Sequence, residues 1–267
     1  MSGPGALFPD GPYRFHLTLR RGEPREFFGA QDLSGRLLQE RAKWLSENPA
    51  RYAALLPGNE PLLAEAAELG EKAWGLPRVA SVLELGAAWE PDVLLLSPDP
   101  TGAFRLRGGA LCFPTGWALD EKIGHPLDFI HGVVPGLNAA LASPIQQFLS
   151  RLKPGAVFHR DNWGIVATDE LNLHPSRGLP APALPVVLAR LWLRVEYQAL
   201  LALPRTRGIL FGIRIALHRL DELVQDSTAV MGLRQALATM PPEMASYKKL
   251  AGIRVKLIEF LEEKSGF

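Results

Sequence analysis

Residues 191–201, LWLRVEYQALL, form the stretch from which the fold can be worked outward, because their side chains alternate as in a β-strand. With a period of two, Arg194, Glu196 and Gln198 point to one face of the strand, between bulky apolar side chains. The opposite face carries apolar residues and Tyr197. We therefore expect a strand with one face for a core and one face that presents polar groups.

Four other short runs have the composition of strands and are bounded by proline, glycine or polar residues. They are residues 92–97, 104–113, 157–166 and 209–217. Helical spacing over 119–130 and 137–152 separates the second run from the third. Five strands without regular βαβ alternation predict an antiparallel sheet in an α+β fold.

The order of these elements divides the chain into three regions. Residues 1–90 are expected to form an N-terminal arm and a helical layer, in which 13–19 alternate as a short first strand or an extended arm. Residues 91–218 hold two strands, helices and three strands, which is the element order of a PAS domain. Residues 219–267 are predicted to be helices packed on this core. We expect one compact unit, with a PAS-like five-stranded antiparallel sheet that holds a small ligand beneath its inserted helices.

Charge and composition exclude several classes of function. The chain has 29 Lys and Arg against 28 Asp and Glu, so its net charge of +1 favours neither nucleic acid nor an anionic membrane. Its apolar runs are far shorter than the ~20 residues of a membrane span, and its N-terminus lacks the pattern of a secretory signal. A single cysteine excludes an internal disulfide. We expect a cytoplasmic protein without a membrane or nucleic-acid partner.

Several separate motifs occur in an order that is similar to one known family. They are CFPTGW at 112–117, EKIG at 121–124, IHGVVPG at 130–136, RDNWG at 160–164, LRVEYQAL at 193–200, LPRT at 203–206 and ILFGIR at 209–214. The chain resembles the haem-dependent oxidative N-demethylases, which include the haem subunit of dimethylamine monooxygenase. Tyr197 and Ala199 stand where the family pattern has Arg and Thr, so one positive charge is missing from this strand.

This resemblance implies a PAS-like fold that carries haem b on one histidine. The implied reaction uses dioxygen to oxidise an N-methyl group of a small amine, and it releases formaldehyde. Because the chain has no nicotinamide-binding fingerprint, a separate flavin or iron–sulfur reductase is also implied. The alternative is a non-catalytic haem or small-ligand sensor or binding subunit, since PAS folds serve such functions as well. Either protein is compatible with an oligomer.

Histidine spacing agrees with a haem ligand better than with a protein-built metal site. The six histidines contain no close His-x-x-His or His-Glu-x-x-His pair, whereas haem iron needs as few as one protein ligand. His131 follows an apolar segment and precedes a turn at the start of a predicted helix, so it is the first candidate for the iron. His125, before Pro126, is the second. The ordinary alternative for His131 is a ring that donates to a backbone carbonyl in a turn.

A cationic amine needs a carboxylate or an aromatic face to offset its desolvation. Glu196 is the first candidate for this catalytic carboxylate and Asp161 the second, and the same group would accept the ammonium proton. Arg194 is a further catalytic candidate, whose guanidinium also suits a haem propionate. If the last strand places Arg214 beside Glu196, that arginine joins a partly neutralised cofactor-binding network. The alternative is a solvated sheet face with ordinary cross-strand ion pairs.

Other residues of the shared motifs have both a functional and a structural interpretation. Trp117 and Trp163 lie beside glycines and are candidates to line a porphyrin pocket, although both also suit a core. Cys112 is a possible thiolate ligand, but its apolar neighbours favour a small buried residue. Lys122 and Lys248 match family positions, and lysines on helices are usually solvated.

Overall fold

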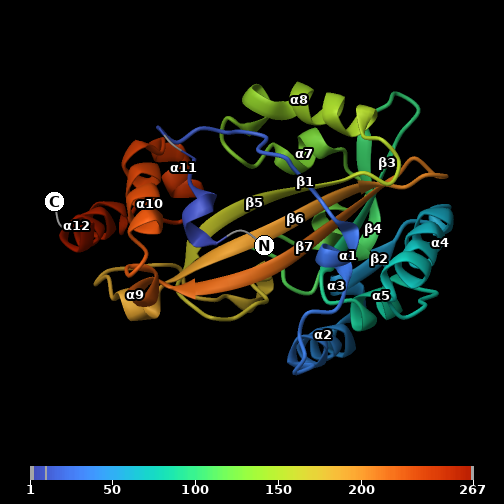
Figure 1. The fold of residues 1–267 in the computed structure, drawn as a ribbon, viewed down its shortest axis with the longest axis horizontal. Helices are drawn as coiled ribbons and strands as arrows, with labels where there is room; N and C mark the ends of the chain where they lie inside the picture. Colours follow the sequence, from blue (N-terminus) through green and yellow to red (C-terminus); the bar gives the residue numbers. More distant parts are fainter. Residues whose placement is uncertain (1–2, 10, 266–267) are drawn as a thin grey trace.

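A seven-stranded antiparallel sheet lies at the centre of the protein (Figure 1). The structure is a computed structural model that describes residues 3–9 and 11–265. Met1 and Ser2, which begin the N-terminal stretch without a secretory signal pattern, lie outside the described residues. The strands are β1 (Arg20–Gly22), β2 (Ala53–Leu55), β3 (Asp92–Pro98), β4 (Phe104–Ala110), β5 (Val157–Val166), β6 (Trp192–Ala202) and β7 (Ile209–Arg219). Their order across the sheet is β1-β5-β6-β7-β3-β4-β2.

The α+β class is confirmed, but the predicted number of five strands is wrong. The five predicted strands correspond to β3 to β7, and the second ends at Ala110, before the predicted end at 113. The two additional strands, β1 and β2, pair with the edges of this central group. Each has only three residues, which is too short for a pattern of period two to stand out.

Helices precede the central strands, interrupt them and follow them. The α-helices are α1 (Pro24–Phe28), α2 (Arg36–Glu47), α3 (Pro49–Tyr52), α4 (Glu60–Leu69), α5 (Val82–Ala88), α6 (Leu119–Lys122), α7 (Leu127–His131), α8 (Leu137–Arg151), α9 (Leu220–Leu223), α10 (Ser227–Thr239), α11 (Pro242–Tyr247) and α12 (Arg254–Ser265). The predicted helix over 119–130 is two short helices, because Gly124 takes a φ of +84° and Pro126 follows it. Among the described residues, no helix combines the length and apolar character needed to cross a bilayer.

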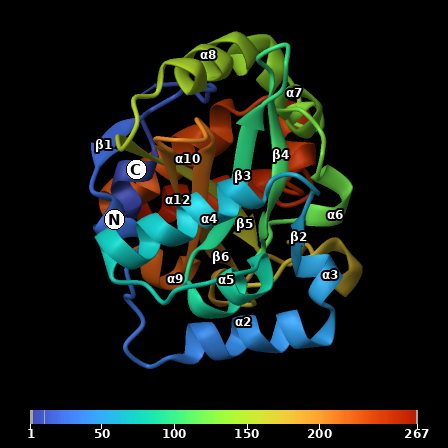
Figure 2. The same cartoon turned by 90° about the vertical axis from the view of Figure 1, so that its right-hand side faces the viewer.

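The two faces of the sheet are covered by different layers. On one face, α1, α4 and α5 contribute to the main core, in which the ring of Phe28 stacks on Trp74 at 4.7 Å between centroids. On the other face, α8 packs through Leu149 against a second apolar cluster that includes residues of β3 and β7. Figure 2 shows α8 and α2 on opposite sides of the molecule, with strands between them. The face beneath α7 and α8 is the face that holds the candidate site.

The register of the strands decides which side chains share that face. Glu196 of β6 lies opposite Asn162 of β5 and Ile215 of β7. Arg214 lies opposite Tyr197 and therefore points to the other face of the sheet. The predicted juxtaposition of Arg214 with Glu196 is wrong, because adjacent residues of one strand point to opposite faces.

Residues 13–19 form an extended arm without regular secondary structure, the second of the two forms expected for them. The backbone N–H of Tyr13 donates to Thr239 Oγ1 at 2.7 Å, and an added Cβ on Gly136 would lie 3.5 Å from the ring of Phe15. The arm thus contacts both α10 and the loop before α8. Figure 1 shows it as the blue segment that passes from the region of α11 toward α8 before it reaches β1.

Candidate functional site

A cavity of about 330 Å³, named the main cavity below, lies between the sheet, helices α7 and α8 and the N-terminal arm. Its volume falls within the ~300–1,000 Å³ that is typical of cofactor and small-molecule sites. Most of its lining is apolar. The apolar residues of the strands and of α7, α8 and the loop between these helices are Leu94, Leu96, Leu106, Leu127, Ile130, Val133, Val134, Leu137, Ile145, Phe148, Leu149, Leu200, Phe211 and Ile213. Polar groups are concentrated on β5, β6, the arm and the end of α11.

His131 brings an imidazole to this cavity from the last residue of α7. Burial, together with the positive charge of Arg160, lowers the pKa of His131 to about 4. The ring is therefore neutral at pH 7, with a nitrogen lone pair available. Within the described residues the ring makes no hydrogen bond, so it is not the carbonyl-bonded turn histidine of the ordinary interpretation. Its position suits a metal ligand.

The other histidine proposed for the iron lies elsewhere. His125 is exposed, and its ring stacks on Phe129 with centroids 3.9 Å apart, outside the cavity. A histidine that the sequence did not single out, His16 of the arm, does line the cavity. Its Nδ1 is hydrogen-bonded to Thr18 Oγ1, and its pKa is lowered by burial and by Arg160. The alternation at 13–19 did not show which side chains of the arm face inward.

Glu196 and Gln198 form a polar wall on β6, together with Asn162 on β5. Oε2 of Glu196 accepts hydrogen bonds from Gln198 Nε2 at 2.8 Å and from Asn162 Nδ2 at 3.2 Å. In the described part of the chain, Oε1 of Glu196 accepts no hydrogen bond. The two amides thus orient a carboxylate, only 8% of whose residue surface is exposed, and leave one oxygen for a ligand.

Lys248 follows α11 and lines the cavity, in contrast to the solvated lysine expected from the sequence. Its ammonium group donates to the backbone oxygen of Trp163 at 2.6 Å and lies 5.0 Å from the centre of that ring. Burial lowers the pKa of Lys248 to about 8, against the opposing effect of the Glu196 charge. The protonated and neutral forms are therefore both accessible near neutral pH.

The lowered pKa of Lys248 makes stability depend on pH. Below about pH 8 the lysine is charged in both the folded and the unfolded state, and burial of that charge opposes folding. Between pH 8 and the ordinary value of 10.5, the folded state loses the proton first, so this contribution to stability rises with pH. The difference in free energy of urea unfolding between the wild type and Lys248→Met should therefore rise over this interval. A constant difference from pH 7 to 10.5 would show that burial does not perturb Lys248.

Three further predicted residues also lie at the cavity. Trp117 and Trp163 both line it, and Trp163 makes an edge-to-face contact with Phe8 at 5.2 Å. Asp161 lies at the cavity too, but its carboxylate is paired with Arg20. The charge of Asp161 is therefore already balanced by Arg20, whereas Glu196 has a carboxylate oxygen available for a ligand.

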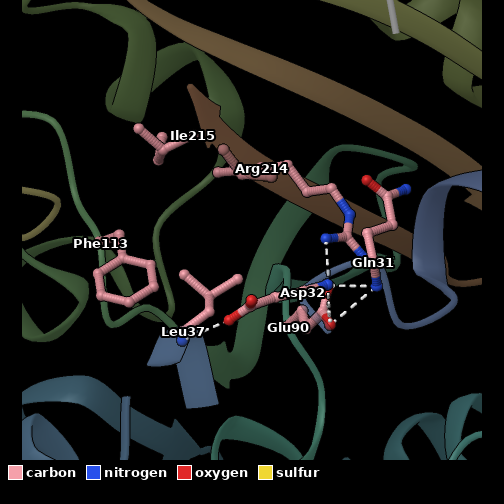
Figure 3. A pocket seen from close by; sticks show the side chains of 8 residues that line it. Gln31, Asp32, Leu37, Glu90, Phe113, Arg214 and Ile215 are labelled. Carbon is pink, nitrogen blue, oxygen red and sulfur yellow. Dashed lines mark hydrogen bonds and ion pairs between the residues drawn. The ribbon is translucent and has the colours of Figure 1, made fainter. Parts of the chain in front are cut away.

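Arg194 and Arg214 are buried outside this cavity and hold the fold together. Arg194 donates through Nη2 to the backbone oxygens of Phe113 and Leu171, both at 2.8 Å, so its guanidinium ties two loops to β6. Arg214 donates to Glu90 at 2.7 Å in a separate cavity of about 220 Å³ (Figure 3). Neither arginine lines the predicted site. Each guanidinium is held elsewhere by its hydrogen bonds to other parts of the protein.

The Glu90 pair in Figure 3 has the contacts of a structural network. The Glu90 carboxylate also accepts from the backbone N–H groups of Gln31 and Asp32, at 2.8 and 2.9 Å. Arg214 donates in addition to the backbone oxygens of Phe27 and Gly29, both at 2.6 Å. These bonds fasten the segment between α1 and α2 to β7, and the charges of Glu90 and Arg214 compensate each other.

Cys112 does not contact the main cavity. It is buried in a small cluster with Trp44 and Tyr52, and burial raises the pKa of its thiol to about 12. A thiol with such a pKa is protonated at pH 7 and is a poor metal ligand. Among the described residues, no three His, Cys, Asp or Glu side chains are grouped as metal ligands. His131 and His16 are the imidazoles at the site.

Comparison with known protein families gives a match over residues 76–258, more than half of the chain. The family model is described as haem-dependent oxidative N-demethylase, alpha subunit-like. The matched region contains His131, Glu196 and Lys248, together with the helices and strands β3 to β7 that enclose the cavity. The N-terminal arm lies before it.

Proposed function

The chain belongs to the family of haem-dependent oxidative N-demethylase alpha subunit-like proteins, and we propose that it is a haem-dependent monooxygenase acting on a small methylated amine. The product would be the demethylated amine and formaldehyde. The observation that carries the proposal is the neutral imidazole of His131, which faces a largely apolar cavity that also contains a carboxylate. Haem b, when bound, would supply the activation of dioxygen.

The residues at the cavity fit a haem group. A porphyrin presents broad apolar faces, which suit the leucine, isoleucine and phenylalanine side chains of the lining. Its iron needs a protein ligand, which His131 would provide. The element order of two strands, inserted helices and three strands supports a PAS-like core over residues 91–218, with residues 1–90 and 219–267 as flanking layers. Trp117 and Trp163 would border the pocket.

Glu196 would bind the amine through its Oε1, which accepts no hydrogen bond from the described residues. An alkylammonium ion entering the cavity loses its hydration, and a charge-assisted hydrogen bond to Glu196 offsets part of that cost. Oxidation of a methyl group next to nitrogen is assisted by the nitrogen lone pair, so the ammonium proton must leave first. Glu196 is placed to accept it, and the nearby amine of Lys248, with its pKa of about 8, is placed to take part in its transfer.

The electrons for the reaction would come from a separate reductase that carries flavin or an iron–sulfur centre. The alpha-subunit-like description of the family supports an assembly of more than one chain. The same family description favours an oxidative enzyme over the sensor or binding subunit that the sequence left open. A cytoplasmic location is part of this proposal.

Turnover of dimethylamine tests the function. The haem-loaded protein, supplied with a reductase and NADPH, should release formaldehyde, measured as its fluorescent adduct. Glu196→Gln keeps the shape of the side chain and removes its charge, so catalytic efficiency should fall roughly 10- to 150-fold, the equivalent of a charged hydrogen bond of about 1.5–3 kcal/mol. Glu222→Gln, at an exposed position, is the matched control and should retain full activity. A haem-loaded wild type that releases no formaldehyde from a panel of methylamines would contradict the proposed function.

A further inference from the structure

Arg160 of β5 brings a guanidinium group to the main cavity. Within residues 3–9 and 11–265, it makes no hydrogen bond and no ion pair. The arginines buried elsewhere behave differently. Arg41 pairs with Asp92, Arg214 pairs with Glu90, and Arg194 donates to backbone oxygens. The donors of Arg160 are thus not used by any described residue of the protein.

The carboxylates near Arg160 are held by other groups. Arg160 lies directly opposite Gln198 on the cavity face of the sheet. This pair is two residues along each strand from the Asn162–Glu196 pair. Glu196 is hydrogen-bonded to the amides of Asn162 and Gln198, and Asp161 pairs with Arg20. Both charges act on Arg160 through space, but neither forms an ion pair with it. Its own pKa is lowered, chiefly by desolvation.

Positive charge exceeds negative charge at this cavity. Arg14, Lys122, Arg160 and Lys248 line it, against the carboxylates of Glu196 and Asp161. Since the charge of Asp161 is already compensated by Arg20, the net positive charge that remains at the cavity favours an anionic group on a ligand. A planar guanidinium binds a carboxylate or a phosphate through two parallel hydrogen bonds.

We propose that Arg160 binds a carboxylate of a ligand held in this cavity. The inference rests on the proposed function and deepens it, because two ligands of that reaction can supply the group. One source is a propionate of the haem, and the other is a carboxylate on the methylated amine itself, as in an N-methyl amino acid. The arginine chosen from the sequence for such a role, Arg194, is fully engaged with loop carbonyls and with Thr115.

The first arm of the test uses iron-free protoporphyrin IX, so that binding does not depend on an iron–histidine bond. Its affinity for the apoprotein is measured by fluorescence and compared with that of its dimethyl ester. If Arg160 holds a propionate, Arg160→Gln should weaken binding of the free acid about 10- to 100-fold and leave the ester unaffected. Arg160→Lys should retain part of the affinity, and Arg151→Gln, at an exposed position on α8, should retain all of it.

The second arm measures the affinities of N-methylglycine and dimethylamine by calorimetry on the haem-loaded protein, or on the apoprotein if haem does not bind. If the substrate supplies the carboxylate, Arg160→Gln should weaken the binding of N-methylglycine about 10- to 100-fold and leave the binding of dimethylamine unchanged. An effect in either arm supports the anion site and identifies its source. Equal binding by wild type and Arg160→Gln in both arms, or no binding of any of these probes, would overturn it.

The two proposals fail in different ways. A chain that binds protoporphyrin IX through Arg160 but never yields formaldehyde retains the anion site and loses the proposed enzyme. The melting temperature of apo Arg160→Gln separates a binding role from a structural one. Because Arg160→Gln removes an unpaired charge and breaks no hydrogen bond or ion pair among the described residues, this temperature should equal or exceed that of the wild type. A marked fall would show that Arg160 supports the fold and would contradict the assignment.

Discussion

His131→Gly should abolish the native absorption spectrum of the haem-loaded protein. His131 is a neutral imidazole at the wall of the main cavity, and in the described residues its ring is not used by any protein hydrogen bond. Under the proposed assignment, removing the ring takes away the protein ligand of the haem iron and opens a space of imidazole size. Added imidazole should fill that space and restore the Soret band, which a merely structural histidine would not allow.

Two other histidines are the matched controls for this result. His125→Ala should leave the spectrum unchanged, because His125 is exposed and stacks on Phe129 outside the cavity. His16→Ala removes the second imidazole of the cavity and tests whether the arm supplies the ligand instead. If the band survives in His131→Gly and disappears in His16→Ala, the assignment of the ligand to His131 is wrong.

Asp92→Asn should destabilise the fold by about 3–5 kcal/mol, the usual cost of removing one partner of a buried ion pair. Asp92 and Arg41 are both almost completely buried, and their side chains meet at 2.7 Å. The same carboxylate accepts from the backbone N–H groups of Cys112 and Phe113, at 2.6 and 2.9 Å. The substitution leaves the Arg41 charge uncompensated and loosens the loop after β4.

Urea unfolding at pH 7 measures this effect. Lys72→Met is the control, because it removes an exposed ion pair with Glu68 and should change the free energy of unfolding little. The double variant Arg41→Met with Asp92→Asn should recover part of the loss, since no unpaired charge remains. A single variant as stable as the wild type would mean that this network does not anchor the loop.

The strands of the core could be predicted from the sequence, whereas the use of individual side chains could not. Alternation placed Glu196 and Gln198 on one face of β6, and both line the cavity. The same alternation placed Arg194 with them, but the residue lies where loop carbonyls reach it, and its donors are used there. Period two gives a direction for each side chain and says nothing about which loops close over it.

The register and the arm account for most of the remaining differences. A strand pattern does not fix how β7 lies against β6, and a shift of one residue decides whether Arg214 or its neighbours face Glu196. His16 lines the cavity through an arm whose contacts to α10 and to the loop before α8 are remote in sequence. Arg160 stood within the motif RDNWG, where its charge was a signal that the sequence analysis did not use.

The most direct test of the account is a Soret titration of the apoprotein with haem, run beside the variant Leu200→Trp. Leu200 lies on the cavity side of β6, so an indole at this position would fill space needed by a porphyrin. The wild type should saturate at one haem per chain, and Leu200→Trp should keep its circular dichroism spectrum yet bind none. A wild type without a saturable band, or a variant that binds haem equally well, would contradict the claim that this cavity holds the cofactor.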